Sequence, residues 1–171
     1  DGRGDTAWDG MLARMRAAGS LRVSLPDRFE AQLRGYQEEG FRWLARAAEW
    51  GVGVCLADDM GLGKTLQALA LLSRRREEGP ALVVAPTSVG ANWLDETRRF
   101  ACGLCPHLYG ESDREALLKT AGPGDLVVCT YGLMVRDQAL LKEVRWATVV
   151  LDEAQAIKNS ATQRFKAAVS L

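Results

Sequence analysis

Apolar positions follow two alternating patterns along most of the chain. In some segments they recur three and four residues apart, the spacing of one face of an α-helix, as at Leu33, Tyr36 and Leu44. Other segments are short continuous apolar runs, typical of strands buried on both faces. The predicted strands are 52–57, 81–85, 104–109, 126–130 and 147–151. The predicted helices are 8–18, 32–50, 64–73, one marked by Val89, Trp93 and Phe100, one capped by Ser112 and Glu115, 133–144, and one capped by Ser160 and Gln163 and ending at Val169.

Strands that alternate with helices predict an α/β fold with a parallel, doubly wound sheet. In such sheets ligands bind beyond the carboxyl ends of the strands, here after Ala57, Ala85, Thr130 and Leu151. The 171 residues suffice for one domain. Residues 1–26 read as a linker or the tail of a preceding segment, and 27–171 as the domain.

The amino-acid composition excludes few classes of function. The chain has 22 basic and 22 acidic residues, so it lacks the excess positive charge of a dedicated nucleic-acid-binding domain. We expect no membrane-spanning helix and no secretion signal, and a reducing, cytosolic compartment. Cys102, Cys105 and His107 offer three metal ligands where a structural zinc needs four, so an ordinary loop leading into a strand is favoured.

A phosphate-binding loop follows the first predicted strand. Gly61, Gly63, Lys64 and Thr65 match the end of the pattern G-x-x-x-x-G-K-[ST], with Asp58 at the first glycine. Glycines allow a tight turn with inward amides, and the helix that follows adds partial positive charge. Lys64 would reach the β- and γ-phosphates, and Thr65 would offer its hydroxyl to magnesium. A chance glycine-rich turn is the alternative.

Two acids end the last predicted strand. Asp152 would hold magnesium, directly or through water, and Glu153 would orient and deprotonate the water that attacks the γ-phosphate. An isolated acid at a strand end is more often a turn former or a helix cap. Because the phosphate loop supplies the complementary half of an ATPase site, the catalytic interpretation is favoured here, with Lys64 and Glu153 as catalytic residues.

In combination these motifs resemble the first lobe of Swi/Snf-type DNA translocase ATPases of helicase superfamily two. Within that family the resemblance is to the bacterial members, because Gln155 stands where other members carry His. The resemblance runs from about residue 25 to the end of the chain. Its segments are Leu33–Gln37 with Gly40 and Trp43–Leu44, Asp58–Gln67, Ala85–Val89 with Asn92–Trp93 and Glu96, Cys129–Tyr131, and Leu151–Gln155 with Ile157–Asn159.

The resemblance implies a RecA-like lobe that binds ATP and magnesium and tracks along double-stranded DNA. Gln37 would read the adenine, and Gln155 would sense the γ-phosphate or couple to another lobe. The implied nucleotide contacts are Arg34, Gln37, Asp59, Met60, Gly61, Leu62, Gly63, Lys64, Thr65 and Leu66. The implied DNA contacts are Pro86, Thr87, Ser88, Thr130 and Tyr131, although capping and turn formation explain the hydroxyl residues locally. Trp93 is expected to pack under its helix.

The resemblance also implies partners: double-stranded DNA, a second RecA-like lobe of the same full-length chain, and a DNA-bound protein such as RNA polymerase, in a nucleoid-associated location. The lobe reads as incomplete at its C-terminus, so we expect a nearly inactive isolated lobe with a gap at the centre of its sheet and marginal stability. Two alternatives remain: another superfamily-two helicase that separates strands or acts on RNA, and a non-catalytic interaction module with the same fold.

Overall fold

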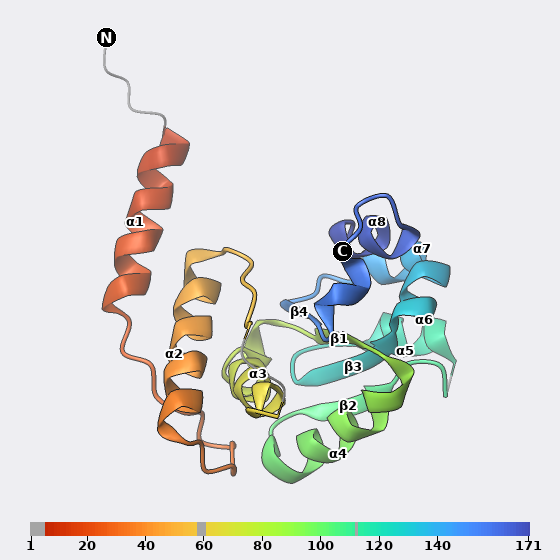
Figure 1. Ribbon diagram of the computed structural model, residues 1–171, viewed down its shortest axis with the longest axis horizontal. Helices are drawn as coiled ribbons and strands as arrows, with labels where there is room; N and C mark the ends of the chain where they lie inside the picture. Colours follow the sequence, from red (N-terminus) through yellow and green to blue (C-terminus); the bar gives the residue numbers. More distant parts are fainter. Residues whose placement is uncertain (1–5, 58–60, 112) are drawn as a thin grey trace.

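A four-stranded parallel sheet forms the centre of the molecule. The computed structural model describes residues 6–57, 61–111 and 113–171 (Figure 1). Within these residues the strands are ordered β2-β3-β1-β4 and all pairs are parallel. Their bounds are β1 Ala81–Ala85, β2 Cys105–Leu108, β3 Asp125–Thr130 and β4 Thr148–Leu151. The predicted α/β fold with a parallel sheet is therefore confirmed.

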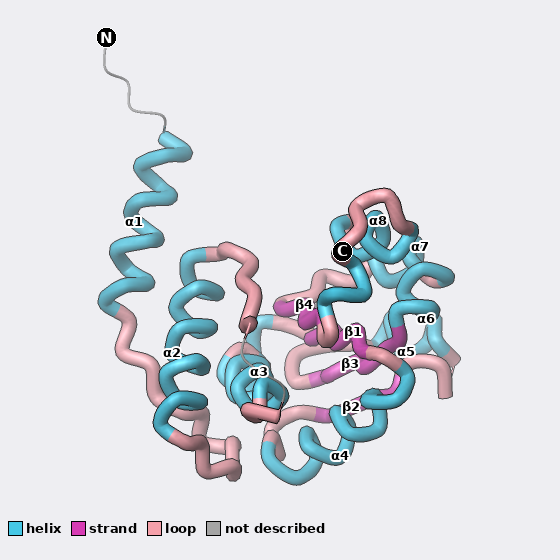
Figure 2. Tube along the Cα trace, in the orientation of Figure 1, coloured by secondary structure: helices cyan, strands magenta, loops and turns pink. Residues whose placement is uncertain are grey.

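Helices cover both faces of the sheet (Figure 2). The helices are α1 Thr6–Ser20, α2 Gly35–Trp50, α3 Lys64–Arg74, α4 Gly90–Phe100, α5 Arg114–Thr120, α6 Tyr131–Arg136, α7 Gln138–Lys142 and α8 Gln163–Val169, with short 3-10 turns at Arg76–Glu78, Thr87–Val89 and Ala154–Ile157. Helix α1 lies beside α2, on its side away from the sheet (Figure 1). None of the described helices has the length and apolar character of a membrane span.

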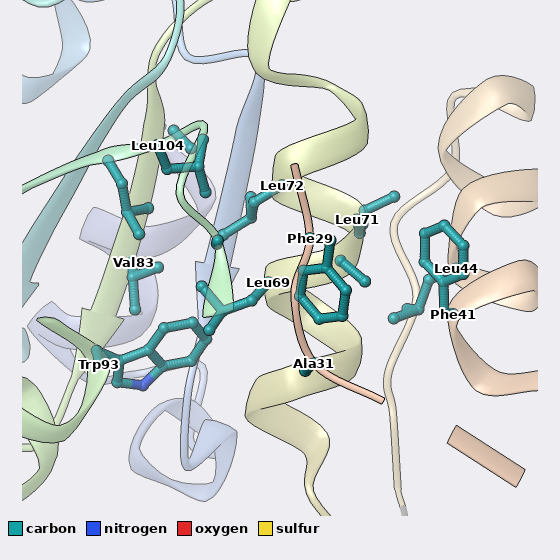
Figure 3. Packing of buried hydrophobic residues seen from close by; sticks show 14 of the residues in the cluster. Phe29, Ala31, Phe41, Leu44, Leu69, Leu71, Leu72, Val83, Trp93 and Leu104 are labelled. Carbon is teal, nitrogen blue, oxygen red and sulfur yellow. The ribbon is translucent and has the colours of Figure 1, made fainter. Parts of the chain in front are cut away.

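The sheet separates two apolar clusters because successive strand residues point to opposite faces. Val83 and Val128 pack with residues of α2, α3 and α4, which we call the first cluster. Figure 3 shows part of it, with Leu69 and Leu72 of α3 between the sheet and α2. Val84 and Val127 face the other way and pack with residues of α5 to α8, which we call the second cluster. Strand β1 and the middle of β3 are buried, as their continuous apolar runs predicted, whereas β4 is only half-buried.

Three predicted helix details are wrong. The helix predicted over 133–144 is two helices, which meet at Asp137, whose carboxylate accepts a hydrogen bond from Arg114 at 2.6 Å. The N-cap of α5 is Asp113, which accepts from two amides, whereas the predicted cap at Ser112 lies outside the described residues. Thr162 caps α8 in place of the predicted Ser160, because the helix begins only at Gln163.

The predicted strand over 52–57 is absent. The segment has no regular structure, and Val54 is 43% exposed. Strand β1 already pairs with β3 on one side and β4 on the other, and no described strand pairs with the outer edge of β4. An apolar run becomes a strand only where a neighbour completes its hydrogen bonds. The gap was expected between the predicted strand over 52–57 and the strand that leads to Asp152. Strand β4 has no described neighbour on its outer edge, but because residues 52–57 lie outside the sheet, no gap divides the four described strands.

Candidate functional site

The carboxyl ends of three neighbouring strands bring three candidate segments together. Ala85 of β1 is in register with Thr130 of β3, and Val84 with Leu151 of β4. The amide of Asp152 continues the ladder by donating to the Val84 carbonyl at 2.8 Å. The segments that begin at Pro86, Thr130 and Asp152 therefore lie side by side at the edge where parallel sheets bind ligands.

Helix α3 points its N-terminus toward the same edge. Arg75, directly after α3, donates to the Thr148 hydroxyl at the start of β4 at 2.9 Å, so the C-terminus of α3 lies beside the beginning of that strand. The eleven-residue helix is roughly 16 Å long. The step from Thr148 to Asp152 covers roughly 13 Å in an extended strand. Toward the N-terminus of α3, Leu69 packs in the same cluster as Trp93, whose indole donates to Asp152, so the helix runs toward the end of the sheet that carries Asp152 (Figure 3).

The phosphate-loop residues that the structure describes begin this helix. Gly63 is the N-cap, with φ 73° and ψ 38° in the left-handed region, and Gly61 has φ 82°. Lys64, Thr65 and Leu66 form the first helical turn and are half-buried. Free amides and partial positive charge collect at such an N-terminus, which favours an anion there. The predicted residues Asp58, Asp59 and Met60 lie outside the described residues.

Two residues of α2 hold the loop. Gln37 donates to the Leu62 carbonyl at 3.0 Å and accepts from the Arg34 amide at 2.9 Å. The Tyr36 hydroxyl also donates to the Leu62 carbonyl, at 3.3 Å. Gln37 is 6% exposed and thus ties the start of α2 to the loop. The adenine role of Gln37 and the nucleotide contact of Arg34 stay predictions. The hydrogen bond from Tyr36 to the loop was not predicted, because a tyrosine in a helix carries no motif signal.

Besides donating its amide to Val84, Asp152 accepts three hydrogen bonds from the protein. Its carboxylate accepts from the Trp93 indole nitrogen at 2.9 Å and from the Glu153 amide at 2.9 Å. Its carbonyl accepts from the Tyr131 hydroxyl at 2.7 Å. A carboxylate has about four acceptor positions, so the two oxygens keep capacity for water or a cation. Trp93 is buried, as its position predicted, but its bond to Asp152 was not predicted.

Glu153 has an unusual backbone. It is the one described residue other than glycine with a positive φ, at 50°. A non-glycine residue in the left-handed region is energetically unfavourable, and such residues collect at functional sites. The Gln155 side chain donates to the Glu153 carboxylate. This contact places Gln155 beside the proposed catalytic acid, while its role in sensing phosphate or coupling to another lobe stays a prediction.

The candidate DNA contacts differ in accessibility. Thr87 and Ser88 are exposed on the 3-10 turn after β1, next to the half-buried Pro86. The Thr130 hydroxyl accepts a hydrogen bond from the Leu133 amide at 3.2 Å and so caps α6. This is the local capping role that the sequence offered as an alternative to DNA contact. Tyr131 is only 4% exposed, so its ring is not accessible to DNA in this structure.

The cysteine pair singled out in the sequence is divided. Cys105 lies with His107 and Asp125 in one group whose ligand atoms are within 4.8 Å of one another, and Cys102 is exposed outside it. His107 and Asp125 already bond to each other at 2.8 Å. Three ligands remain one short of a closed structural zinc site. Residues 105–108 form β2, in agreement with a loop leading into a strand.

Comparison with known proteins gives a consistent result. Residues 36–171 match the SNF2-related domain. The chain is 41% identical over 163 residues to an Arabidopsis thaliana protein, "Chromatin-remodeling ATPase INO80", covering 86% of this chain and 11% of that protein. It is 44% identical over 149 residues to the Bacillus subtilis "Putative ATP-dependent helicase/translocase YwqA", covering 81% of this chain and 16% of that protein.

A solved structure is similar over most of the chain. The Sulfolobus solfataricus SWI2/SNF2 ATPase core in complex with dsDNA superimposes with a TM-score of 0.79 at 42% identity, over 88% of this chain and 32% of the other. The chain thus spans about a tenth of the Arabidopsis relative and about a third of the solved core.

Proposed function

The chain belongs to the SNF2-related domain family, and on this premise we propose that it is the ATP-binding lobe of a double-stranded-DNA-dependent ATPase that translocates along DNA and remodels protein–DNA complexes. The observation that carries the proposal is the single sheet edge shared by the segments at Ala85, Thr130 and Asp152, with the N-terminus of α3 directed toward it. A nucleotide site and a DNA-side surface would then meet within one lobe.

The residues present fit ATP and magnesium. The α3 N-terminus with Lys64 offers amides and a positive charge to phosphates, and Thr65 offers a hydroxyl. Asp152 keeps acceptor capacity on both carboxylate oxygens, as a metal bound directly or through water requires. Bound magnesium would neutralise charge on the β- and γ-phosphates. Glu153 would orient the attacking water and accept its proton.

On the DNA side, exposed Thr87 and Ser88 would contact phosphates through hydroxyls and amides. Such contacts carry no base information, which suits movement over any sequence and a chain without net positive charge. We propose double-stranded DNA as the substrate track, a second RecA-like lobe of the full-length chain as the catalytic partner, and a DNA-bound protein such as RNA polymerase as the target. A nucleoid-associated location follows from the same proposal.

The test is ATP hydrolysis by the full-length protein, measured as phosphate release with duplex DNA, single-stranded DNA, RNA or no nucleic acid. We expect duplex DNA to stimulate turnover most. Glu153→Gln should retain nucleotide binding and reduce turnover by about a thousandfold, whereas Lys64→Ala should weaken binding itself. Lys142→Ala, a change at an exposed position of α7 outside the proposed contacts, is the control.

Stimulation by RNA or single strands instead of duplex DNA would favour another superfamily-two helicase. Turnover and nucleotide binding that are unaffected by both site variants would favour a non-catalytic interaction module. The isolated lobe is expected to be nearly inactive, because arginine fingers in related enzymes contribute about three to five powers of ten to turnover.

A further inference from the structure

Two buried aromatic residues hold Asp152 from two different elements. Trp93 of α4 donates from its indole nitrogen to the carboxylate at 2.9 Å, and Tyr131 of α6 donates from its hydroxyl to the carbonyl at 2.7 Å. The donors reach the side chain and the backbone of the same residue. Together they fix both the rotamer of the carboxylate and the position of the chain that carries it.

Each donor stands shortly after a candidate DNA segment. Trp93 lies in the first turn of α4, which directly follows the exposed turn of Thr87 and Ser88. Tyr131 is the first residue of α6 and follows Thr130, the cap of that helix. Both segments begin at the ends of strands adjacent in the sheet. A displacement of either segment therefore moves a donor of Asp152.

Both donors are buried in packed apolar clusters. Trp93 is 2% exposed and packs in the first cluster, which also holds Leu69 of α3 and Val83 of β1 (Figure 3). Tyr131 packs in the second cluster, on the opposite face of the sheet. Large side chains in closely packed interiors do not change rotamer freely, so each ring moves with its helix. Asp152 is thereby connected to both faces of the sheet.

We propose that Trp93 and Tyr131 are positioning residues that orient Asp152 and transmit contact at the DNA-side segments 86–88 and 130 to the nucleotide site. The inference rests on the proposed function, because it assigns a metal-holding role to Asp152 and a DNA role to the two segments. DNA that shifts α4 or α6 would change the orientation of the carboxylate and hence the strength with which the site holds magnesium and nucleotide. Neither aromatic residue touches the reacting atoms.

The matched variants remove one donor atom each. Tyr131→Phe deletes only the hydroxyl, and benzothienylalanine at position 93 keeps the ring shape while deleting the N–H. Trp93→Phe is the simpler companion. The chain supplies the controls: Trp146 donates its indole N–H to the Leu141 carbonyl at 2.8 Å, away from Asp152, so Trp146→Phe is matched to position 93. Tyr109→Phe is matched to position 131, because Tyr109 is a buried tyrosine of the same cluster.

Three quantities are measured in the full-length protein: the magnesium concentration that half-saturates binding of a fluorescent ATP analogue, the ratio of duplex-stimulated to basal turnover, and the melting temperature. Loss of the indole N–H should raise the half-saturating magnesium concentration about tenfold, the effect of one charge-assisted hydrogen bond. Tyr131→Phe should reduce the DNA stimulation ratio severalfold with a smaller effect on magnesium. The controls should leave the magnesium concentration and the ratio unchanged.

The outcomes separate the two levels of the proposal. Position-93 and position-131 variants that match their controls in magnesium dependence and DNA stimulation, in an enzyme that duplex DNA does stimulate, would overturn the positioning role and leave the proposed function intact. An unmodified protein that duplex DNA does not stimulate would refute the proposed function. If Trp93→Phe lowers the melting temperature strongly, the benzothienylalanine variant, which preserves packing, decides the question.

Discussion

At the scale of single residues, Gly63 is constrained in two independent ways. Its φ of 73° lies in the region that L side chains rarely adopt. A Cβ there would also lie 2.3 Å from the Gln37 side-chain nitrogen. Gln37 cannot easily move away, because it is buried and hydrogen-bonded at both ends of its amide. The glycine therefore serves the turn and the close approach of α2 at once.

Gly63→Ala should consequently impair the loop more than Gly61→Ala. We expect a loss of about 1–3 kcal/mol in unfolding free energy, from strain combined with displacement of Gln37, and a nucleotide affinity at least about tenfold weaker. Gly61 also has a positive φ, at 82°, but has open space around the Cβ position. Gly61→Ala therefore measures the cost of backbone strain without the contact with Gln37. Urea unfolding and fluorescent-nucleotide titration measure the two effects. Equal losses in both variants would show that the contact with Gln37 is unimportant.

The residues at the site differ in how well the sequence could reveal them. The strand-end position of Asp152 was predictable, because the apolar run before it and the phosphate loop each have a local signature. Trp93 was predicted only as a packing residue. Its bond to Asp152 joins positions 59 apart, and helical spacing specifies which side a residue faces but not which atom its nitrogen meets.

At the scale of elements, α2 depends on a glycine in its interior. Replacement of a helical glycine by alanine ordinarily stabilises a protein by about 0.5–1 kcal/mol. At Gly40, however, a Cβ would lie 1.8 Å from the Gln67 side-chain oxygen of α3, and Gln67 is 0% exposed. A methyl group there would have to displace the buried Gln67 amide, so we expect the usual preference to be reversed.

Gly40→Ala should therefore destabilise the protein by about 1–3 kcal/mol, through overpacking between α2 and α3. Gly10→Ala is the control, because Gly10 lies in α1 with nothing within 4 Å of the Cβ position. It should be neutral or stabilising by about 0.5 kcal/mol. Thermal and urea unfolding followed by circular dichroism distinguish the two. Stabilisation by both substitutions would mean that the Gln67 side chain can move aside at no cost.

The elements show where pattern alone is insufficient. Residues 81–85 and 52–57 are similar apolar runs, yet only the first is a strand, because it has hydrogen-bonded neighbours on both sides. Whether a segment pairs depends on the other strands of the sheet, so it cannot be read from the sequence of that segment alone. Likewise, the apolar spacing over 133–144 is continuous, but the Arg114–Asp137 ion pair, formed with another helix, accompanies a break in it.

At the scale of the whole molecule, the two faces of the sheet differ chemically. The second cluster contains Tyr109, Cys129 and Tyr131, all buried, and the first cluster holds none of these ionisable groups. Burial, reinforced by Asp137 near Tyr109 and Cys129 and by Asp152 near Tyr131, raises the pKa of each group to about 12. The folded state of this face thus requires the three groups to be neutral.

Stability should therefore fall on the alkaline side. The ordinary pKa is 9.0 for Cys129 and 10.0 for the tyrosines, and folding raises it, so the unfolded chain releases these protons first. The stabilisation is fully present below pH 9.0 and is lost progressively as the pH rises toward about 12. Urea unfolding at increasing pH measures the loss of unfolding free energy. Tyr109→Phe should make the decline shallower, while Tyr36→Phe, at an exposed position, should not change it. A free energy of unfolding that stays constant across this range would mean that the second cluster admits water and tolerates charge, and its rigid hold on Asp152 through Tyr131 would then have to be reconsidered.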